Sequence, residues 1–289
     1  MSSKSVTVPA TTTTTTTTTT NPTTDGGSTV FEADRFVGDL WKWRQEQAAD
    51  ASGNDTTLPD EFGLVLASGW QEMGEILQQD AYSTEFRNAV QSCFKDDPKD
   101  NSAVYLYPAY ALHVTVATFH SFTRQTKDAA TRSTLRKVWC NVLRKAAQDK
   151  DWPQQPLQLE FQSTQIGRKA GILLWNETTG GMETMRRILR ATVESCRHDM
   201  VQQGVDPDTL SIPNIVHSTY LRFAQVPQTS GEVVQRRFEE RVQPLANTVF
   251  GKSSPVRLPD TKLVDEYVAY MHSPTMDDKS VLERCRFTS

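Results

Sequence analysis

Ala-Leu-His-Val-Thr-Val at residues 111–116 and Ile-Val-His-Ser-Thr-Tyr at residues 215–220 are the two stretches around which this chain is organised. Each places a histidine in an apolar, strand-like run and a threonine two residues later. Side chains of a strand alternate between its two faces, so the histidine and the threonine point the same way. Two such strands would line one cleft with the imidazoles of His113 and His217 and the hydroxyls of Thr115 and Thr219. This set of groups suits acid–base chemistry on a phosphate ester without a metal.

The segments that follow the two histidines are alike. The first expected strand, about Tyr110–Phe119, precedes an amphipathic helix around Leu135–Ala146 and strands at about 157–162 and 170–175. The second, about Asn214–Phe223, precedes a helix at about 231–250, interrupted at Pro244, and a strand pair at about 256–258 and 263–270. The order of histidine strand, helix and strand pair therefore occurs twice. This repetition predicts a duplicated fold in which the two histidines face one cleft from neighbouring strands.

Three regions differ in composition. Residues 1–28 contain an unbroken threonine run, Thr11–Thr20, and no apolar segment of the secretory type. They are rich in hydroxyls, as transit peptides are, but Lys4 is their only basic residue, so we expect a disordered tail. Residues 29–59 predict a helix, about 31–47, and a polar linker. Residues 60–289 form the expected main domain, which includes a helix at about 71–79 and a long helix at about 182–203.

Composition excludes several classes of function. The net charge of −4 argues against an extended nucleic-acid surface, because such affinity comes from neutralised phosphates. No apolar run is long enough to span a membrane, and no phosphate loop or set of metal ligands is present.

The four cysteines lack a CxxC pair and are expected to be reduced thiols of an intracellular protein. We expect a cytoplasmic monomer without a cofactor; a nuclear location and organelle targeting by the N-terminus stay open.

The two motifs resemble those of the two-histidine (2H) phosphoesterase superfamily. The matching residues are His113-Val114-Thr115-Val116 and His217-Ser218-Thr219-Tyr220. The second motif continues to Arg222, which is similar to the His-x-Thr-x-x-Arg variant of the RNA 2′,5′-ligase-like branch. The likeness covers about residues 60–272. It implies a duplicated, two-lobed α+β fold, with antiparallel sheets lining a central cleft and helices outside.

The resemblance also implies an activity: a phosphodiesterase that acts on RNA ends or small nucleotides with a 2′,3′-cyclic phosphate or a 2′,5′ linkage. One histidine would act as general base and the other as general acid, while Thr115 and Thr219 donate hydrogen bonds to phosphate oxygens. Arg222 could bind phosphate too, although strict alternation places it on the opposite face of the strand unless the strand ends or twists there. The alternatives are an enzyme that trims RNA 3′ ends and a nucleotide- or RNA-binding module without turnover.

Two further groups of residues have an ordinary structural interpretation and a functional one. Tyr105, Tyr107 and Tyr110 precede the first histidine and are expected to be strand and bend aromatics rather than base-stacking residues. Arg186, Arg190 and Arg197 align on one helix face, where a solvated surface is favoured over an RNA site.

Overall fold

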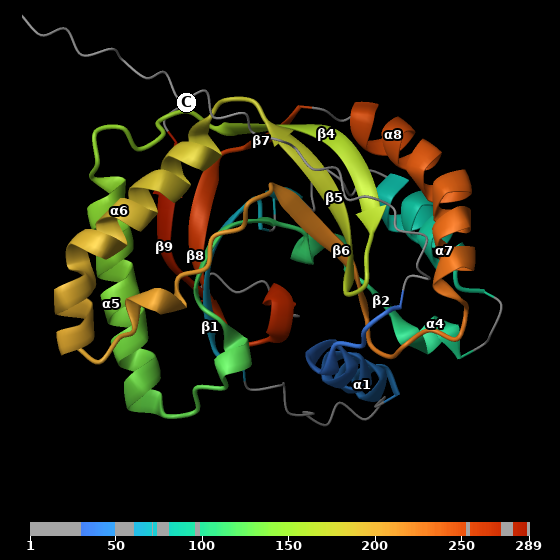
Figure 1. The fold of residues 1–289 in the computed structure, drawn as a ribbon, viewed down its shortest axis with the longest axis horizontal. Coiled ribbons are helices and arrows are strands. Elements are labelled where there is room, and N and C mark those ends of the chain that lie inside the picture. Colours follow the sequence, from blue (N-terminus) through green and yellow to red (C-terminus); the bar gives the residue numbers. More distant parts are fainter. Residues whose placement is uncertain are drawn as a thin grey trace, which may run out of the picture.

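Two antiparallel sheets form the centre of the molecule, as the computed structural model shows (Figure 1). The first sheet has the strand order β3-β1-β8-β9 and contains β1 (Gly63–Ser68), β3 (Val114–His120), β8 (Asp260–Glu266) and β9 (Val281–Arg286). The second has the order β2-β6-β5-β4-β7 and contains β2 (Val104–Leu106), β4 (Leu157–Ile166), β5 (Ala170–Glu177), β6 (His217–Phe223) and β7 (Val256–Leu258). The predicted α+β class, with antiparallel sheets and helices, is therefore confirmed.

The structure describes residues 30–49, 61–70, 72–73, 81–95, 99–252, 255–272 and 280–287. The expected tail at 1–28 and the polar linker at 50–60 lie outside these residues, as does most of the helix expected at 71–79.

The two histidine strands belong to different sheets, so they are neighbours in space without being paired with each other. Strand β3 pairs with β1, and β6 pairs with β2 and β5. The two strands contact each other where the sheets meet. The two histidines are therefore brought together by packing of the sheets and not by ladder hydrogen bonds.

The expected pairing of the strands near 256–258 and 263–270 is wrong. Strand β7 pairs with β4 in the second sheet, whereas β8 pairs with β1 and β9 in the first. Only Pro259 separates β7 from β8, and the shortest common hairpin loop has two residues. The chain cannot reverse over one residue, so it passes directly from one sheet into the other.

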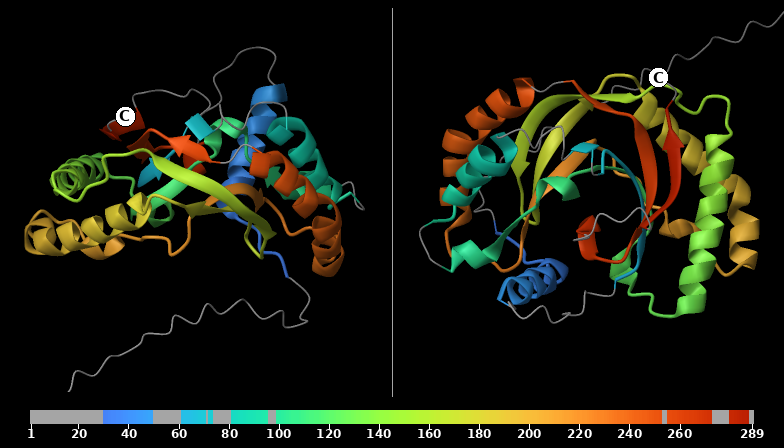
Figure 2. Two further views of the ribbon diagram at one scale, coloured as in Figure 1. Left: turned by 90° about the horizontal axis from the view of Figure 1, so that it is seen from above. Right: turned by 180° about the vertical axis from the view of Figure 1, so that it is seen from behind.

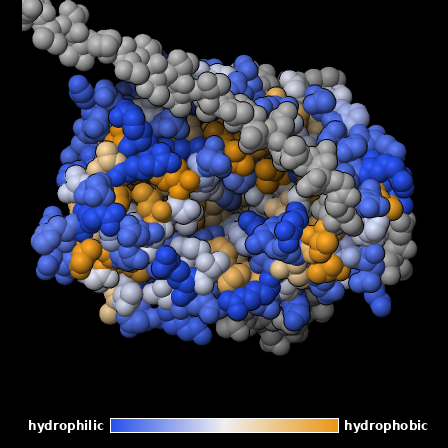
Figure 3. Space-filling model, viewed as in Figure 1, coloured by the Kyte–Doolittle hydropathy of each residue, from blue (hydrophilic) through white to orange (hydrophobic). Residues whose placement is uncertain are grey.

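Helices flank the two sheets on their outer sides (Figures 1 and 2). Helices α5 (Ala129–Ala147) and α6 (Gly181–Gln202) pack on each other and against β9 and β3 respectively. Helix α7 (Gly231–Arg237), the π-helical turn η5 (Phe238–Val242) and helix α8 (Gln243–Lys252) lie beside the second sheet, and α8 packs on β4. Hydrophilic residues predominate on both of these helical flanks (Figure 3).

The helix predicted at 231–250 runs through α7, η5 and α8, and its regular α-helical pattern is interrupted by the π-helical turn η5 just before Pro244. Pro244 has no N–H to donate, and its ring crowds the carbonyl group of Glu240, which belongs to η5, so the irregular turn lies where an interior proline disturbs a helix. The remaining short helical segments are η1 (Ala81–Phe86), α3 (Arg87–Ser92), α4 (Asp100–Ala103), η2 (Ala109–Ala111), η3 (Phe122–Arg124), η4 (Pro207–Thr209) and η6 (Ala269–Met271).

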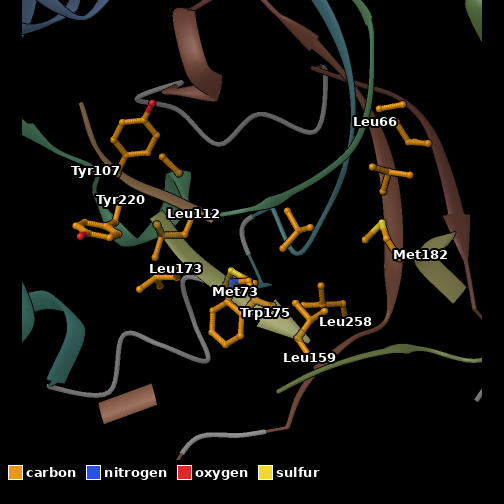
Figure 4. Close-up of a cluster of buried hydrophobic side chains, with 14 of the residues drawn as sticks. Leu66, Met73, Tyr107, Leu112, Leu159, Leu173, Trp175, Met182, Tyr220 and Leu258 are labelled. Carbon is orange, nitrogen blue, oxygen red and sulfur yellow. The ribbon is translucent and has the colours of Figure 1, made fainter. Parts of the chain in front are cut away.

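The hydrophobic core takes side chains from both sheets. Figure 4 shows Leu66 of the first sheet and Leu159, Leu173 and Trp175 of the second among its members. The polar residues that alternate with His217 and Thr219 also point into this core. Trp175 Nε1 donates to Ser218 Oγ at 3.0 Å, and Thr164 Oγ1 lies 3.3 Å from the Tyr220 hydroxyl. The core face of β6 therefore carries polar groups that have partners.

Helix α1 (Arg35–Ala49) confirms the predicted N-terminal helix, and it contacts both β6 and η6. The carboxylate of Asp34 accepts a hydrogen bond from the N–H of Phe36 at 3.0 Å, which satisfies a donor at the start of the helix. The Asp34 N–H donates to the carbonyl of Phe223 at 2.7 Å, so the chain entering α1 is attached to the end of β6.

Candidate active site

One cavity of about 210 Å³ lies where β3 and β6 meet. All five residues predicted from the two motifs line it, namely His113, Thr115, His217, Thr219 and Arg222. Its other lining residues are Val65, Tyr107, Thr118, Ser121, Phe122, Thr123, Glu266, Tyr270 and Met271. The cavity thus combines two imidazoles, several hydroxyls and one guanidinium.

The two imidazoles are held in the same way. His113 Nδ1 lies 2.8 Å from the carbonyl oxygen of Ala111, two residues earlier. A carbonyl can only accept, so Nδ1 carries the hydrogen and Nε2 is the acceptor of the neutral ring. The His217 ring likewise forms a hydrogen bond with the backbone of Ile215, two residues earlier. Backbone groups therefore fix both rings.

A β-bulge in β6 explains why Arg222 reaches the cavity. In the ladder with β5, Gly171 pairs with Leu221 and Ile172 pairs with Thr219, so Tyr220 has no opposite residue. One extra residue reverses the alternation of side chains beyond it. Arg222 therefore lies on the same face as Thr219, although strict alternation predicts the opposite face.

Glycine at position 171 of β5, which has no side chain, leaves the space that this bulge occupies. A Cβ atom on Gly171 would lie 2.7 Å from the ring of Tyr220, which is closer than packed atoms approach. The bulged tyrosine therefore requires glycine at position 171.

Strand β3 contains a matching irregularity. In its ladder with β1, Leu66 pairs with Ala117 and Ala67 pairs with Thr115, which leaves Val116 without an opposite residue. Thr118 consequently lies in the cavity with Thr115. Thr118 follows His113 by five residues, as Arg222 follows His217, so this spacing is a signal that the sequence interpretation missed.

The guanidinium of Arg222 is oriented by three residues. Its Nε donates to the Tyr107 hydroxyl at 3.0 Å, and its Nη1 donates to the Asp34 carboxylate at 3.3 Å. Its Cζ lies 4.0 Å from the centroid of the Tyr270 ring, and the Tyr270 hydroxyl donates to Asp34. These contacts leave N–H groups of the planar fork for an anion. Tyr107 is thus part of the site, in addition to its expected place at a bend.

Arg186 is buried, which corrects the expectation of a solvated position on its helix; only 3% of it is exposed. Its guanidinium donates to the carbonyl oxygens of Val116 at 3.2 Å, Thr115 at 3.0 Å and Ile215 at 3.1 Å. It therefore joins β3 to the segment that precedes β6. The Ile215 backbone also binds the His217 ring, so Arg186 acts on the placement of both histidines.

Burial dominates the protonation of the two histidines. It lowers the pKa of His113 to about 4; the hydrogen bond to Ala111 opposes this, and His217 and Arg222 lower the pKa further. Burial also lowers the pKa of His217, with additional lowering by Arg222 and Arg186. Both rings are therefore neutral near pH 7 in the ligand-free protein. A bound phosphate anion would favour the charged form and raise both pKa values.

Within the part of the chain that the structure describes, no group of three or more His, Cys, Asp or Glu side chains is placed to hold a metal ion. None of the helices in that part combines the length and apolar character that crossing a bilayer would need.

Comparisons with known proteins give a distant likeness. No protein-family model and no curated protein matches the chain. Among solved structures, the crystal structure of TT0787 from Thermus thermophilus matches with a TM-score of 0.40 and 13% sequence identity. The match covers 78% of this chain and 97% of that one. This degree of similarity assigns neither a family nor a function.

Proposed function

We propose that this chain is a metal-independent phosphodiesterase, related to the 2H phosphoesterases, that acts on RNA ends or small nucleotides with a 2′,3′-cyclic phosphate or a 2′,5′ linkage. The observation that carries the proposal is the pair of histidines in one cavity, each fixed by the backbone two residues before it. A threonine accompanies each histidine on the same face.

The residues divide the reaction between them. One imidazole removes a proton from the attacking water or hydroxyl as the new phosphorus–oxygen bond forms. The other imidazole, protonated in the complex, gives its proton to the ribose oxygen as the old bond breaks. Thr115 and Thr219 donate hydrogen bonds to the non-bridging oxygens, on which negative charge builds. Arg222 adds charge-assisted hydrogen bonds from the same side as Thr219.

The size of the cavity supports a small substrate or a chain end. Ligand sites commonly enclose about 300–1,000 Å³. The volume of about 210 Å³ found here suits a phosphate with its adjoining sugar better than several nucleotides.

The proposal is tested with purified protein and a panel containing a 2′,3′-cyclic nucleotide, a 2′,5′-linked dinucleotide and a short RNA trimmed from its 3′ end. His113→Ala and His217→Ala are each expected to lower kcat on the order of 10²–10⁴, with less change in substrate affinity. The double variant should lose less than the product of the two single losses, and EDTA should not abolish turnover.

His198→Ala is the matched control, because His198 is an exposed histidine on α6 and should be replaceable without loss. Full activity in His217→Ala, or a metal requirement, would contradict the two-histidine mechanism. Binding of the reaction product without any turnover of the panel would favour the non-catalytic module instead.

A further inference from the structure

The two-histidine mechanism leaves one titratable group of the cavity unused. Glu266, at the end of β8, lines the cavity together with both histidines, yet only 4% of it is exposed. A carboxyl group buried in the wall of a phosphate site needs a physical explanation, because an ionised carboxylate would repel the phosphate.

The backbone is shaped around this carboxyl group. Glu266 pairs with Gly63 of β1, and a Cβ atom on Gly63 would lie 2.6 Å from Glu266 Oε2. On the other side, the backbone N–H of Met271 donates to Glu266 Oε1 at 3.1 Å, and the Tyr270 backbone also forms a hydrogen bond with the carboxyl group.

The turn that supplies these donors is strained. Tyr270 and Met271 have φ values of 59° and 56°, in the left-handed region that residues with side chains seldom adopt. Each such residue costs on the order of 1–3 kcal/mol and persists where surrounding contacts require it. The strained turn and Gly63 together enclose the carboxyl group of Glu266.

Several charged or titratable groups lie around the carboxyl group of Glu266. Arg222 approaches from β6 and Glu61 from the residues just before β1. Tyr107, Tyr270, His113 and His217 line the same cavity. Burial raises the pKa of Glu266 to about 8; the backbone hydrogen bonds and Arg222 lower it, and Glu61 raises it. At pH 7 the carboxyl group therefore keeps its proton and is a hydrogen-bond donor.

We propose that Glu266 is a ligand-binding residue of this cavity, whose protonated carboxyl group donates a hydrogen bond to an oxygen of the bound phosphate group. The proposal rests on the cavity being the phosphate site of the proposed function. The Glu266 carboxyl group then supplies a hydrogen-bond donor from the β8 side of the cavity, and while protonated it carries no negative charge that would repel the phosphate. Anion binding is then linked to the proton on Glu266, and the affinity for an anion falls as that proton is lost.

Inorganic sulfate is a suitable probe, because it remains a dianion across the whole pH range of interest and only the protein titrates. Sulfate affinity is measured by isothermal titration calorimetry between pH 6 and pH 9.5 for the wild type and for Glu266→Gln. Glutamine keeps an oxygen for the Met271 N–H and supplies an N–H donor at every pH. At pH 7 the two proteins should bind sulfate about equally.

At pH 9 the glutamine variant should bind about tenfold more tightly than the wild type, because the wild type loses about tenfold in affinity for each pH unit above the ionisation of Glu266. Misfolding cannot produce this gain. Calorimetry in buffers of different ionisation enthalpy should also show one proton fewer taken up by the variant at high pH. Glu194→Gln removes an exposed carboxylate of α6 and should follow the wild type.

Parallel affinity curves for the wild type and Glu266→Gln, or no sulfate binding to the wild type, would overturn the proposal. Its failure is distinguishable from failure of the proposed function, since turnover is measured separately. Curves that diverge above pH 8 in a protein without turnover would support Glu266 as a binding residue and contradict the enzyme.

Discussion

The buried side chain of Arg186 connects the backbone of the two stretches that contain the histidine motifs. Its guanidinium satisfies three backbone carbonyls, of which two belong to the first motif and one precedes the second. Its charge also lowers the pKa of His217. A buried cation in this position therefore contacts the backbone of both stretches and also affects the protonation of His217.

Replacing Arg186 should therefore distinguish the effect of its backbone hydrogen bonds on stability from the effect of its charge on the pKa of His217. Arg186→Met leaves up to three carbonyls without this donor, at about 1–3 kcal/mol for each acceptor left unpaired, so urea unfolding should show a large loss of stability. The pKa of His217, followed by NMR titration, should rise, because a neighbouring cation has been removed. Arg186→Lys should keep the pKa of His217 low. Equal His217 pKa values in both variants would show that the charge of Arg186 does not affect the pKa of His217.

The lowered histidine pKa values also predict the pH dependence of the proposed reaction. The profile of kcat/KM reports the free protein, in which one histidine must be neutral and the other charged. Both pKa values lie below the ordinary 6.5, so the maximum of kcat/KM should lie below pH 6.5. Bound phosphate raises both pKa values, so the maximum of kcat should lie at higher pH. Steady-state rates from pH 4 to pH 9 test this order, and a kcat maximum on the acidic side of that of kcat/KM would contradict it.

At the scale of elements, two bulged strands decide which side chains enter the cavity. The bulge at Tyr220 brings Arg222 to the face of Thr219, and the bulge at Val116 does the same for Thr118. The residue before helix α1, Asp34, then fixes the guanidinium of Arg222. The segment that enters the N-terminal helix thus contributes to the cavity.

Filling the space beside the first of these bulges should be costly. In Gly171→Ala the new methyl group meets the Tyr220 ring, and overpacking of this kind costs about 1–3 kcal/mol of unfolding free energy. Adding Tyr220→Leu should recover part of the loss, because the two changes share one contact. Gly167→Ala is the control, since its nearest neighbour would lie at 3.8 Å. Denaturant unfolding measures these variants and Tyr220→Leu alone, and purely additive losses would exclude the proposed steric conflict.

At the scale of the whole molecule, stability should depend on pH through two buried groups with opposite effects. Folded Glu266 holds its proton up to about pH 8, whereas the unfolded carboxyl group releases it near the ordinary 4.5, so stability falls as pH rises through this window. Folded His113 stays neutral down to about pH 4, whereas unfolded histidine gains a proton near 6.5, so stability falls as pH drops from 6.5 to 4.

Thermal unfolding at a series of pH values measures both slopes. The decline in wild-type stability between pH 6.5 and pH 8 should be smaller in Glu266→Gln, and the decline between pH 6.5 and pH 4 should be smaller in His113→Ala. A Glu266→Gln curve parallel to that of the wild type above pH 6.5 would contradict the assignment of the alkaline slope.

Periodic patterns made part of this architecture predictable. The apolar spacing of Leu135–Ala146 predicts α5, and alternation at 157–162 predicts the start of β4. Strand partners follow from contacts across the chain, so local pattern could not show that Pro259 carries the chain from one sheet to the other. The site was predictable where it follows a motif, as for His113 and His217. Glu266 and Asp34 have no local signature, because only the tertiary structure brings them to the cavity.

The placement of β8 between β1 and β9 has a consequence for biosynthesis. Strand β1, every residue of which is buried, has on one side a partner that the ribosome makes almost 200 residues later. Until Asp260–Glu266 has left the ribosome, that apolar edge is open to pairing with other chains, which is the usual route to aggregation of nascent β-sheets. Such distant pairing also slows folding, because a long loop must close before the contacts form. The chain is thus expected to complete its first sheet only after β8 and β9 have left the ribosome.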